Sequence, residues 1–261
     1  MIPPGTGHPR DLATASTPVA HDPEAVLQLA SSAGSLAELD ARSSVCRACP
    51  RLVAWREEVA QVKRASYANE TYWGRPITGW GPSDAPIVVV GLAPAAHGGN
   101  RTGRIFTGDR SGDWLFGALH RAGLANQAAS TSAEDGLELL HARITVPVRC
   151  APPANKPTTV ERDTCSTWLT AEWRLLRPTV RAVVVLGGYG WAALWPVLRA
   201  ADVHVPKRVP SFGHGVEVEL QGGPTVLGCF HVSQQNTFTG RLTEPMLDAV
   251  LARAKVAAGL P

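Results

Sequence analysis

Ala85-Pro-Ile-Val-Val-Val-Gly91 is an almost unbroken run of β-branched residues that ends in glycine. Such a run is typical of a strand that is buried on both faces of a parallel sheet. Similar strands are predicted at Ala142–Val148, Arg181–Gly187 and Thr225–Phe230, and helical patterns separate them. Because strands and helices that alternate in this way form a parallel sheet with helices on both faces, the chain predicts an α/β fold.

The remaining elements are predicted from capping residues and apolar periodicity. Asp22-Pro23 is typical of a helix start, with a capping residue before proline at the first helical position. Val216–Leu220 alternates between apolar and polar residues, which predicts an edge or hairpin strand. Further helices are predicted over Ser35–Ser44, Arg51–Arg64, Ser111–Gly123, Thr158–Leu176, the segment that ends at Leu198 and the segment from Thr243 to Ala257.

The length of 261 residues suits one sizeable domain with a small N-terminal appendage. Residues 1–20 are rich in proline, glycine, serine and threonine and lack periodicity, so they predict a mobile arm in front of a single domain over residues 21–261. No apolar run reaches membrane-spanning length and no secretory signal opens the chain, so a reducing, cytoplasmic setting is expected. The formal net charge of +3 decides neither for nor against a nucleic-acid partner.

Four of the five cysteines have an unusual spacing. Cys46 and Cys49 form a CRAC pair, Cys150 follows after one hundred intervening residues, and Cys165 after fourteen more. Four thiolates from distant segments can hold one tetrahedral metal ion or an iron–sulfur cluster, whereas a reducing setting disfavours disulfides. A zinc ribbon has two short pairs, and a helix-length segment splits the second pair here, so a cluster is favoured and structural zinc is the alternative. Cys229 lies in an apolar run and is expected to be a buried strand residue.

The loops that follow the predicted strands have the least ordinary composition. Ligands of open parallel sheets bind at the carboxyl ends of the strands, so these loops are the expected site. The first loop, GLAPAAHGGNRTGRIFTGD (Gly91–Asp109), lacks the glycine spacing of a dinucleotide fingerprint and the lysine of a P-loop. Its small residues allow backbone amides to approach a planar ligand and stabilise a developing anion. The other two loops are VRCAPPANKPT (Val148–Thr158) and HVSQQNTFTGRLT (His231–Thr243).

Single residues in these loops have both structural and functional interpretations. Phe106 is either a loop anchor packed on the core or an aromatic face that stacks on a base. Asp109 precedes a predicted helix and is either its capping residue or a catalytic carboxylate. His231 follows a buried strand and is either structural or catalytic. Taken one at a time, each residue favours the structural interpretation.

Taken together, the three loops and the four cysteines resemble the uracil-DNA glycosylase superfamily, and within it the iron–sulfur branch known as family five. The resemblance extends from about Val45 to the C-terminus. It implies a three-layer α/β/α sandwich with a central four-stranded parallel sheet. It also implies a monomeric DNA-repair enzyme that flips uracil out of DNA and hydrolyses its N-glycosidic bond, leaving an abasic site. The residues implied as ligands of a [4Fe–4S] cluster are Cys46, Cys49, Cys150 and Cys165.

The resemblance further implies roles in the pocket for residues of the first and third loops. Phe106 stacks on the flipped base. The backbone groups that contact the carbonyl oxygens of the base, and stabilise uracil as it departs as an anion, come from Gly91, Leu92, Ala93 and His231. The side chains expected to enter the minor groove and hold the gap are Gln234, Gln235, Asn236 and Arg241.

The chain departs from the family pattern at two positions. Related branches place an acidic or amide residue just after the first glycine of the first loop, where this chain has Leu92 and Ala93. Asp109 is therefore the carboxylate left to orient water or to stabilise the sugar cation. Many relatives also carry asparagine four residues before the third cysteine, where this chain has Val146.

A pocket without that amide is expected to discriminate less sharply, because rejection of a wrong substrate comes largely from polar groups left unpaired. Activity beyond uracil is therefore expected, for instance on hypoxanthine or on an etheno-adduct such as ethenocytosine. Two alternatives stay open. One is a narrower, uracil-only glycosylase, and the other is a non-catalytic iron–sulfur protein that binds damaged DNA. Asp109 separates the second alternative from an enzyme, because a protein that only binds has no need of a carboxylate at the sugar.

Overall fold

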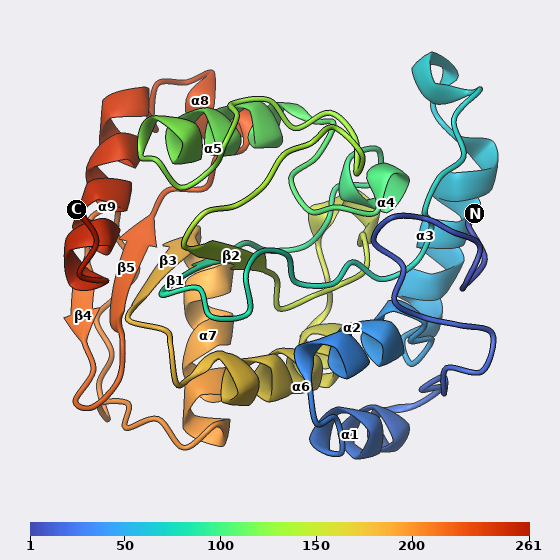
Figure 1. Ribbon diagram of the computed structural model, residues 1–261, viewed down its shortest axis with the longest axis horizontal. Helices are drawn as coiled ribbons and strands as arrows, with labels where there is room; N and C mark the ends of the chain where they lie inside the picture. Colours follow the sequence, from blue (N-terminus) through green and yellow to red (C-terminus); the bar gives the residue numbers. More distant parts are fainter.

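A computed structural model describes residues 1–261 (Figure 1). It contains one five-stranded sheet in the order β2-β1-β3-β5-β4. β2, β1, β3 and β5 run parallel to one another, and β4 pairs antiparallel with β5. The α/β class predicted from the sequence is confirmed. The strands are β1 (Ile87–Val90), β2 (Ala142–Thr145), β3 (Ala182–Leu186), β4 (Glu217–Glu219) and β5 (Thr225–Cys229).

The number of strands is five, not the four that the family resemblance implies. The four parallel strands are the β-branched runs of the sequence, and nearly all of their residues are buried. The fifth strand, β4, is the alternating segment predicted as an edge strand, in which Val218 is buried and its neighbours Glu217 and Glu219 are exposed. It joins the sheet because the outer backbone groups of β5 would otherwise be unpaired.

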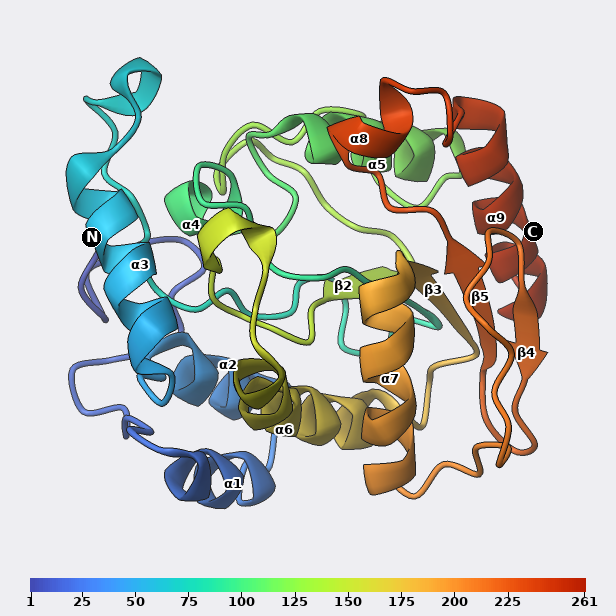
Figure 2. The ribbon, with the colours of Figure 1, turned by 180° about the vertical axis from the view of Figure 1, so that it is seen from behind.

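Helices cover both faces of the sheet, which gives three layers (Figures 1 and 2). α5 and α9 pack on one face, and α6 and α7 pack on the other. Successive side chains of a strand point to opposite faces. In β1, Ile87 and Val89 therefore join the core with α5 and α9, while Val88 and Val90 join the core with α6 and α7. The four helices are α5 (Arg110–Arg121), α6 (Thr159–Leu176), α7 (Gly188–Ala200) and α9 (Glu244–Ala257).

The other helices are shorter or lie outside the three layers. The capping signal at Asp22 is confirmed, because its side chain accepts a hydrogen bond from the amide of Ala25 and Pro23 is the first helical residue. α1 and α2 pack against α6. None of the helices is both long and apolar enough to cross a bilayer. These elements are α1 (Pro23–Ser31), α2 (Leu36–Ser44), α3 (Pro50–Val62), α4 (Gly99–Thr102), α8 (Gln234–Thr237) and the 3₁₀ turns η1 (Ala65–Tyr67) and η2 (Pro153–Asn155).

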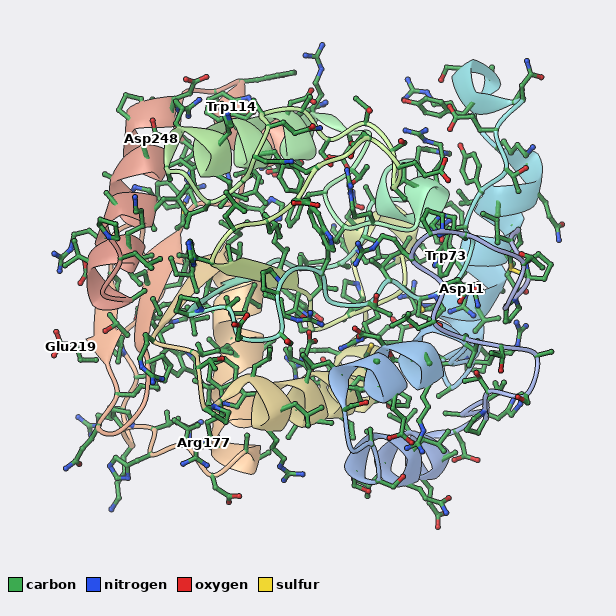
Figure 3. All side chains as sticks on the ribbon, viewed as in Figure 1. Asp11, Trp73, Trp114, Arg177, Glu219 and Asp248 are labelled. Atoms are coloured by element: carbon green, nitrogen blue, oxygen red, sulfur yellow. The ribbon has the colours of Figure 1, made fainter.

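Residues 1–20 form no helix or strand, but they contact the rest of the chain. Asp11 forms an ion pair of 2.6 Å with Arg75, and both side chains are buried. The guanidinium of Arg75 also lies over the ring of Trp73, 3.8 Å from its centroid, and the ring of His8 packs against the same tryptophan. Figure 3 shows Asp11 and Trp73 close together on this side of the molecule. The mobility predicted for this segment stays a prediction.

A network of buried charges joins β2 and the loop that follows it to α6. Glu172 of α6 is fully buried and accepts hydrogen bonds from Arg143, Thr145 and Arg149, at 2.8, 2.7 and 2.7 Å. Asp40 of α2 lies on the other side of the same two arginines, at 3.2 and 3.4 Å. Removing one partner of such a buried group leaves a charge without compensation, so the network fixes how these elements dock.

The outer edge of β2 is paired as well. Trp80 and Ile144 exchange both of their backbone hydrogen bonds, at 2.9 and 2.7 Å, in an isolated antiparallel bridge. The two edges of the sheet therefore differ: the bridge occupies backbone groups of Ile144 at the β2 edge, whereas the short strand β4 forms the other edge.

Candidate functional site

The three unusual loops leave the carboxyl ends of β1, β2 and β5, at one edge of the sheet (Figure 2). Backbone hydrogen bonds connect them to the neighbouring strands. The amide of Gly91 donates to the carbonyl of Thr145 at 3.0 Å, and the amide of Val148 donates to the carbonyl of Leu92 at 3.4 Å. The first and second loops therefore start side by side, as the parallel sheet requires.

The backbone amides of Gly91, Leu92 and Ala93 differ in whether they are already hydrogen-bonded. The amide of Gly91 is used within the sheet, so it is not free for a ligand. The amides of Leu92 and Ala93 make no backbone hydrogen bond, and both residues are half-buried. Of the three first-loop residues predicted to contact a base through the backbone, these two hold free donors. Such amides, fixed in a partly dry site, stabilise negative charge.

Four of the predicted site residues, Gly91, Phe106, Val146 and His231, converge at this edge. A β-carbon on Gly91 would stand 3.0 Å from Cζ of Phe106 and 3.3 Å from Cγ1 of Val146. The rings of Phe106 and His231 lie with their centroids 6.1 Å apart, tilted by 41°. The chain thus brings an aromatic face, an aliphatic side chain and an imidazole together around a glycine. A larger residue at position 91 would crowd both Phe106 and Val146.

Phe106 has a left-handed backbone, with a φ of 53°. This conformation is strained for a bulky residue, so the surrounding structure must hold it. The residues on either side of Phe106 are anchored by hydrogen bonds. The guanidinium of Arg104 donates to the hydroxyl of Ser130 at 3.0 Å and to the carboxylate of Asp135 at 2.6 Å. The carbonyl of Ser130 also accepts from the amide of Gly108 at 2.8 Å. Sequence reasoning missed Arg104 and Asp135, because nothing in the pattern predicts that their loops meet.

Asp109 is the capping residue of α5. Its Oδ1 accepts a hydrogen bond of 3.0 Å from the amide of Gly112, which is the structural interpretation of this residue. Its Oδ2 lies beside Gly98 in the first loop. Burial raises the pKa of the Asp109 carboxyl, against the lowering effect of the amides of Gly112 and Ser111. A carboxylate that caps a helix and is largely shielded from water can also stabilise a nearby positive charge. The catalytic role of Asp109 stays a prediction.

His231 follows β5 and packs against Gly187, where a β-carbon would stand 3.2 Å from that of the histidine. Burial lowers the pKa of His231 to about 4, so its imidazole is neutral at neutral pH. Its carbonyl accepts a hydrogen bond of 2.8 Å from the side-chain amide of Asn236. The residue therefore offers the pocket a neutral ring rather than a positive charge.

The third loop exposes three of its four predicted DNA-binding side chains. Gln234, Gln235 and Arg241 are exposed, and the guanidinium of Arg241 lies over the ring of Phe230, 4.6 Å from its centroid. Asn236 is half-buried, and its side-chain amide binds the carbonyl of His231. The structure thus gives Asn236 a place inside the loop, while its contact with DNA stays a prediction.

The four spaced cysteines line one small pocket. Cys49 stands at the N-terminus of α3, with Cys46 just before it, Cys150 lies in the loop after β2, and Cys165 lies in α6. All four are free thiols, and apolar residues of the pocket wall, such as Trp168, surround them. Cys229 lies apart in the core, fully buried in β5, which confirms the expectation for that residue.

Two donors point at these sulfur atoms. The buried guanidinium of Arg56 donates to Sγ of Cys150 at 2.9 Å and to the carbonyl of Cys46 at 3.1 Å. The amide of Arg149 donates to Sγ of Cys165 at 3.2 Å. Hydrogen bonds to sulfur and a nearby positive charge stabilise thiolates that carry a metal cluster. The donors fit such a group, and sequence reasoning did not find Arg56.

Burial raises the pKa of Cys49 to about 12, with a further rise from the neighbouring Cys150 and Cys46. The pKa values of Cys46 and Cys165 are also raised, mainly by burial. Thiols in this state bind metal only by losing protons. No group of three or more His, Cys, Asp or Glu side chains is arranged to hold a single metal ion.

Residues 78–255 match the family model described as "Uracil DNA glycosylase superfamily". A protein of Mycobacterium tuberculosis named "Type-5 uracil-DNA glycosylase" is 58% identical to the chain over 259 residues, which is 99% of this chain and 95% of that protein. Proteins with the same name from Thermus thermophilus and Pyrobaculum aerophilum are 49% and 47% identical, over 83% and 82% of this chain and 95% and 89% of their own lengths.

Proposed function

Because the chain belongs to the uracil DNA glycosylase superfamily, we propose that it excises uracil from DNA by hydrolysing the N-glycosidic bond, which leaves an abasic site. The observation that carries this proposal is the convergence of Gly91, Phe106, Val146 and His231 at the carboxyl edge of the sheet. The relatives named as type-5 uracil-DNA glycosylases support it, since the two from Mycobacterium tuberculosis and Thermus thermophilus cover 99% and 83% of this chain.

The pocket is suited to a base that has left the duplex. Extrusion of a nucleotide disrupts stacking and pairing, which amounts to a few kcal/mol that contacts in the pocket must offset. In the proposal, the base stacks on Phe106, whose conformation is already fixed by the contacts of Arg104. The free amides of Leu92 and Ala93 bind a carbonyl oxygen of the base and stabilise the uracil anion as the bond breaks.

Asp109 acts on the sugar side of the bond, and His231 acts on the side of the leaving base. Loss of the base leaves positive charge on the sugar, which a nearby carboxylate stabilises. Asp109 supplies that carboxylate and also orients the attacking water. His231, neutral at the working pH, contributes its polar ring and backbone to the leaving base rather than a proton drawn from an imidazolium. The attacking water gives hydroxide to the sugar carbon and a proton to the departing uracil, so the step is balanced.

The proposed range of bases extends beyond uracil. Val146 is buried beside Gly91 and has no polar group to pair with the edge of a base. A pocket that relies on stacking and shape tolerates bases whose hydrogen-bonding edges differ. Hypoxanthine and ethenocytosine are the proposed additional substrates.

The proposed cofactor is a [4Fe–4S] cluster on Cys46, Cys49, Cys150 and Cys165. The convergence of these thiols in one pocket and the hydrogen bonds from Arg56 and Arg149 support it. When bound, the cluster cross-links the segment before α3 to the loop after β2 and to α6 through thiolate–iron bonds. This link would hold the second loop, and with it Val146, against the body of the protein.

A single-turnover assay tests the proposed activity. The protein in excess is incubated with a labelled oligonucleotide that contains one uracil, and abasic sites are then cleaved with alkali. We expect cleavage at the uracil position only, on the strand that carries it. Tight binding of the oligonucleotide without cleavage would overturn the proposal and favour a non-catalytic protein that recognises damaged DNA.

A further inference from the structure

The N-terminal arm, residues 1–20, packs against the first loop of the proposed pocket (Figures 1 and 2). The backbone of Trp73 lies between the two segments. Its amide donates to the carbonyl of Arg101 in the first loop at 2.9 Å, and its carbonyl accepts from the amide of Ile2 in the arm at 3.3 Å. The arm is therefore connected to the stretch of the first loop that leads to Phe106.

A buried ion pair anchors the arm. The carboxylate of Asp11 lies 2.6 Å from the guanidinium of Arg75, and both side chains are almost fully buried. The same carboxylate accepts hydrogen bonds from the amides of Gly5 and Ala13, each at 3.0 Å, so the arm folds around it. Breaking such a pair leaves a buried charge without a partner, which makes detachment of the arm unfavourable.

His8 fills space that the first loop has no side chain to fill. Gly103 has a left-handed backbone, with a φ of 76°, and a β-carbon on it would stand 2.7 Å from Cε1 of His8. The rings of His8 and Trp73 lie with their centroids 4.7 Å apart. Burial lowers the pKa of His8, against the raising effect of a hydrogen bond to the backbone of Thr102. The arm thus places a neutral ring against the first loop, three residues before Phe106.

Arg10 and Arg104 share the ring of Trp80. Their guanidinium carbons lie 5.3 and 4.6 Å from its centroid. Burial, together with the charge of Arg104, lowers the pKa of Arg10 to about 10, so Arg10 remains charged at neutral pH. The face of a tryptophan attracts cations, which offsets the repulsion between the two arginines. Because Arg104 also binds Asp135 and anchors the loop beside Phe106, the arm contacts the same ring as this anchor.

We propose that His8 and Arg10 are positioning residues for the first loop. Their contacts keep Phe106 in the place where it stacks on a base. The loop is rich in glycine, which loses more conformational freedom on ordering than any other residue, so it needs contacts from outside its own sequence. A misplacement of about 1 Å that originates far from the chemistry can lower a rate about 10²-fold. The proposal rests on the excision activity proposed above.

Hydrogen exchange in the free protein tests the support of the loop without any need for activity. The amide of Gly103 donates to the carbonyl of Gly99 at 2.9 Å, and the amide of Gly108 donates to the carbonyl of Ser130 at 2.8 Å. Both amides are protected for as long as the loop stays closed. A contact that is lost when the loop opens locally changes their exchange, whereas a contact that is lost only on global unfolding does not.

The double variant His8→Ala, Arg10→Ala is therefore expected to speed exchange at these two loop amides about tenfold or more. The matched control is Val180→Ala, which truncates a buried residue in the core with α6 and α7. It should speed exchange in β3 and leave the loop amides at the wild-type rate. Loop amides that exchange at the wild-type rate in the double variant, or that respond equally to Val180→Ala, would overturn the proposal.

Single-turnover kinetics test the consequence for excision. With uracil-containing DNA saturated by protein, His8→Ala and Arg10→Ala are each expected to slow excision about tenfold or more, while the Kd for DNA changes less than about twofold. His8→Phe keeps a ring beside Gly103 and should stay within about threefold of the wild-type rate. Val180→Ala should not change the rate.

The wild-type rate in both alanine variants, or an equal loss in Val180→Ala, would overturn the positioning role. The two proposals can fail separately. If the wild-type protein excises no uracil, the proposed function fails, whereas faster exchange of the loop amides in the double variant still supports the hold of the arm on the first loop.

Discussion

The carboxylate of Asp109 lies directly against Gly98, where a β-carbon would overlap its Oδ2. A larger residue at position 98 would collide with this carboxylate, so Gly98 leaves the space that the carboxylate occupies. The same carboxylate caps α5 through its other oxygen. One residue thus joins the start of a helix to the first loop of the proposed pocket, and its two roles can be separated by substitution.

Asp109→Asn is expected to keep DNA affinity and to lower the single-turnover rate by about 10²–10⁴-fold, because the amide cannot stabilise a sugar cation as a carboxylate does. The melting temperature should change little, since asparagine caps helices about as well as aspartate. Asp113→Asn, an exposed position in the same helix, is the matched control. If correctly folded Asp109→Asn protein turns over at nearly the wild-type rate, Asp109 only caps α5 and has no catalytic role.

Stability should depend on His231 in mildly acidic solution. Burial lowers its pKa to about 4 in the folded protein, whereas a histidine in an unfolded chain titrates near about 6.5. Between these values the unfolded chain binds a proton that the folded chain does not, so the free energy of unfolding decreases as the pH falls through this window. We expect His231→Gln to flatten the curve of melting temperature against pH from about 6.5 to about 4.

Asp109 acts in the opposite direction on this curve. Its raised pKa makes the folded protein bind a proton more readily than the unfolded chain, which favours folding as the pH falls. The effect of His231→Gln on the curve of melting temperature against pH is therefore also measured in protein that carries Asp109→Asn. If His231→Gln leaves the shape of the curve unchanged both with and without Asp109→Asn, the histidine is not the group responsible.

The four cysteines of the pocket should determine the colour of the protein. Thiolate-to-iron charge transfer gives a broad absorption near ~400 nm, so the purified protein is expected to be brown. Alanine at Cys46, Cys49, Cys150 or Cys165 should bleach this band and lower the melting temperature, whereas Cys229→Ala should keep the colour. Stoichiometric zinc without iron, in protein prepared without oxygen, would refute the cluster.

Arg56 should protect the cluster without being a ligand. Its guanidinium donates to Sγ of Cys150 from a buried position, so Arg56→Met removes a hydrogen bond and a compensating charge while all four thiols remain. We expect faster bleaching of the visible band by an iron chelator, measured at equal initial iron content. Arg181→Met, at an exposed arginine far from the pocket, is the control. The same bleaching rate in Arg56→Met and wild-type protein would contradict this role.

Val146 should set the choice of base. Val146→Asn places an amide beside Gly91 and Phe106, where it can pair with the edge of uracil. The ratio of single-turnover rates on uracil and hypoxanthine should then shift toward uracil. An unchanged ratio in folded Val146→Asn protein would mean that this side chain does not face the base.

Much of this arrangement could be predicted from the sequence, for physical reasons. The runs at Ile87–Val90 and Ala182–Leu186 predict parallel strands because both of their faces are apolar. Loops after such strands meet at one edge, which brings Gly91, Phe106 and His231 together. Four-residue helices such as α4 and α8 escape prediction, since a single turn shows no periodicity.

Other parts depend on contacts that no local pattern reveals. Arg56 reaches Cys150 across 94 positions of the chain, and Arg104 reaches Asp135 across 31. The local sequence around an arginine does not show whether its side chain faces water or a buried sulfur atom, because this depends on how helix α3 and the loops dock. The side chain of Asn236 turns inward to the carbonyl of His231 for the same reason.

The two edges of the sheet affect how the protein behaves at high concentration. A β-branched sheet with an open edge is a template on which a strand of another molecule can add, and repeated addition leads to aggregates. At one edge, β4 presents the exposed carboxylates Glu217 and Glu219, the second of which is labelled in Figure 3. Glu217 is paired with Arg253 at 2.8 Å. At the other edge, Trp80 occupies the backbone groups of Ile144. Charged side chains at the β4 edge and the Trp80 bridge at the β2 edge therefore both disfavour strand-by-strand self-association, and concentrated solutions of the folded protein should stay free of cross-β assemblies.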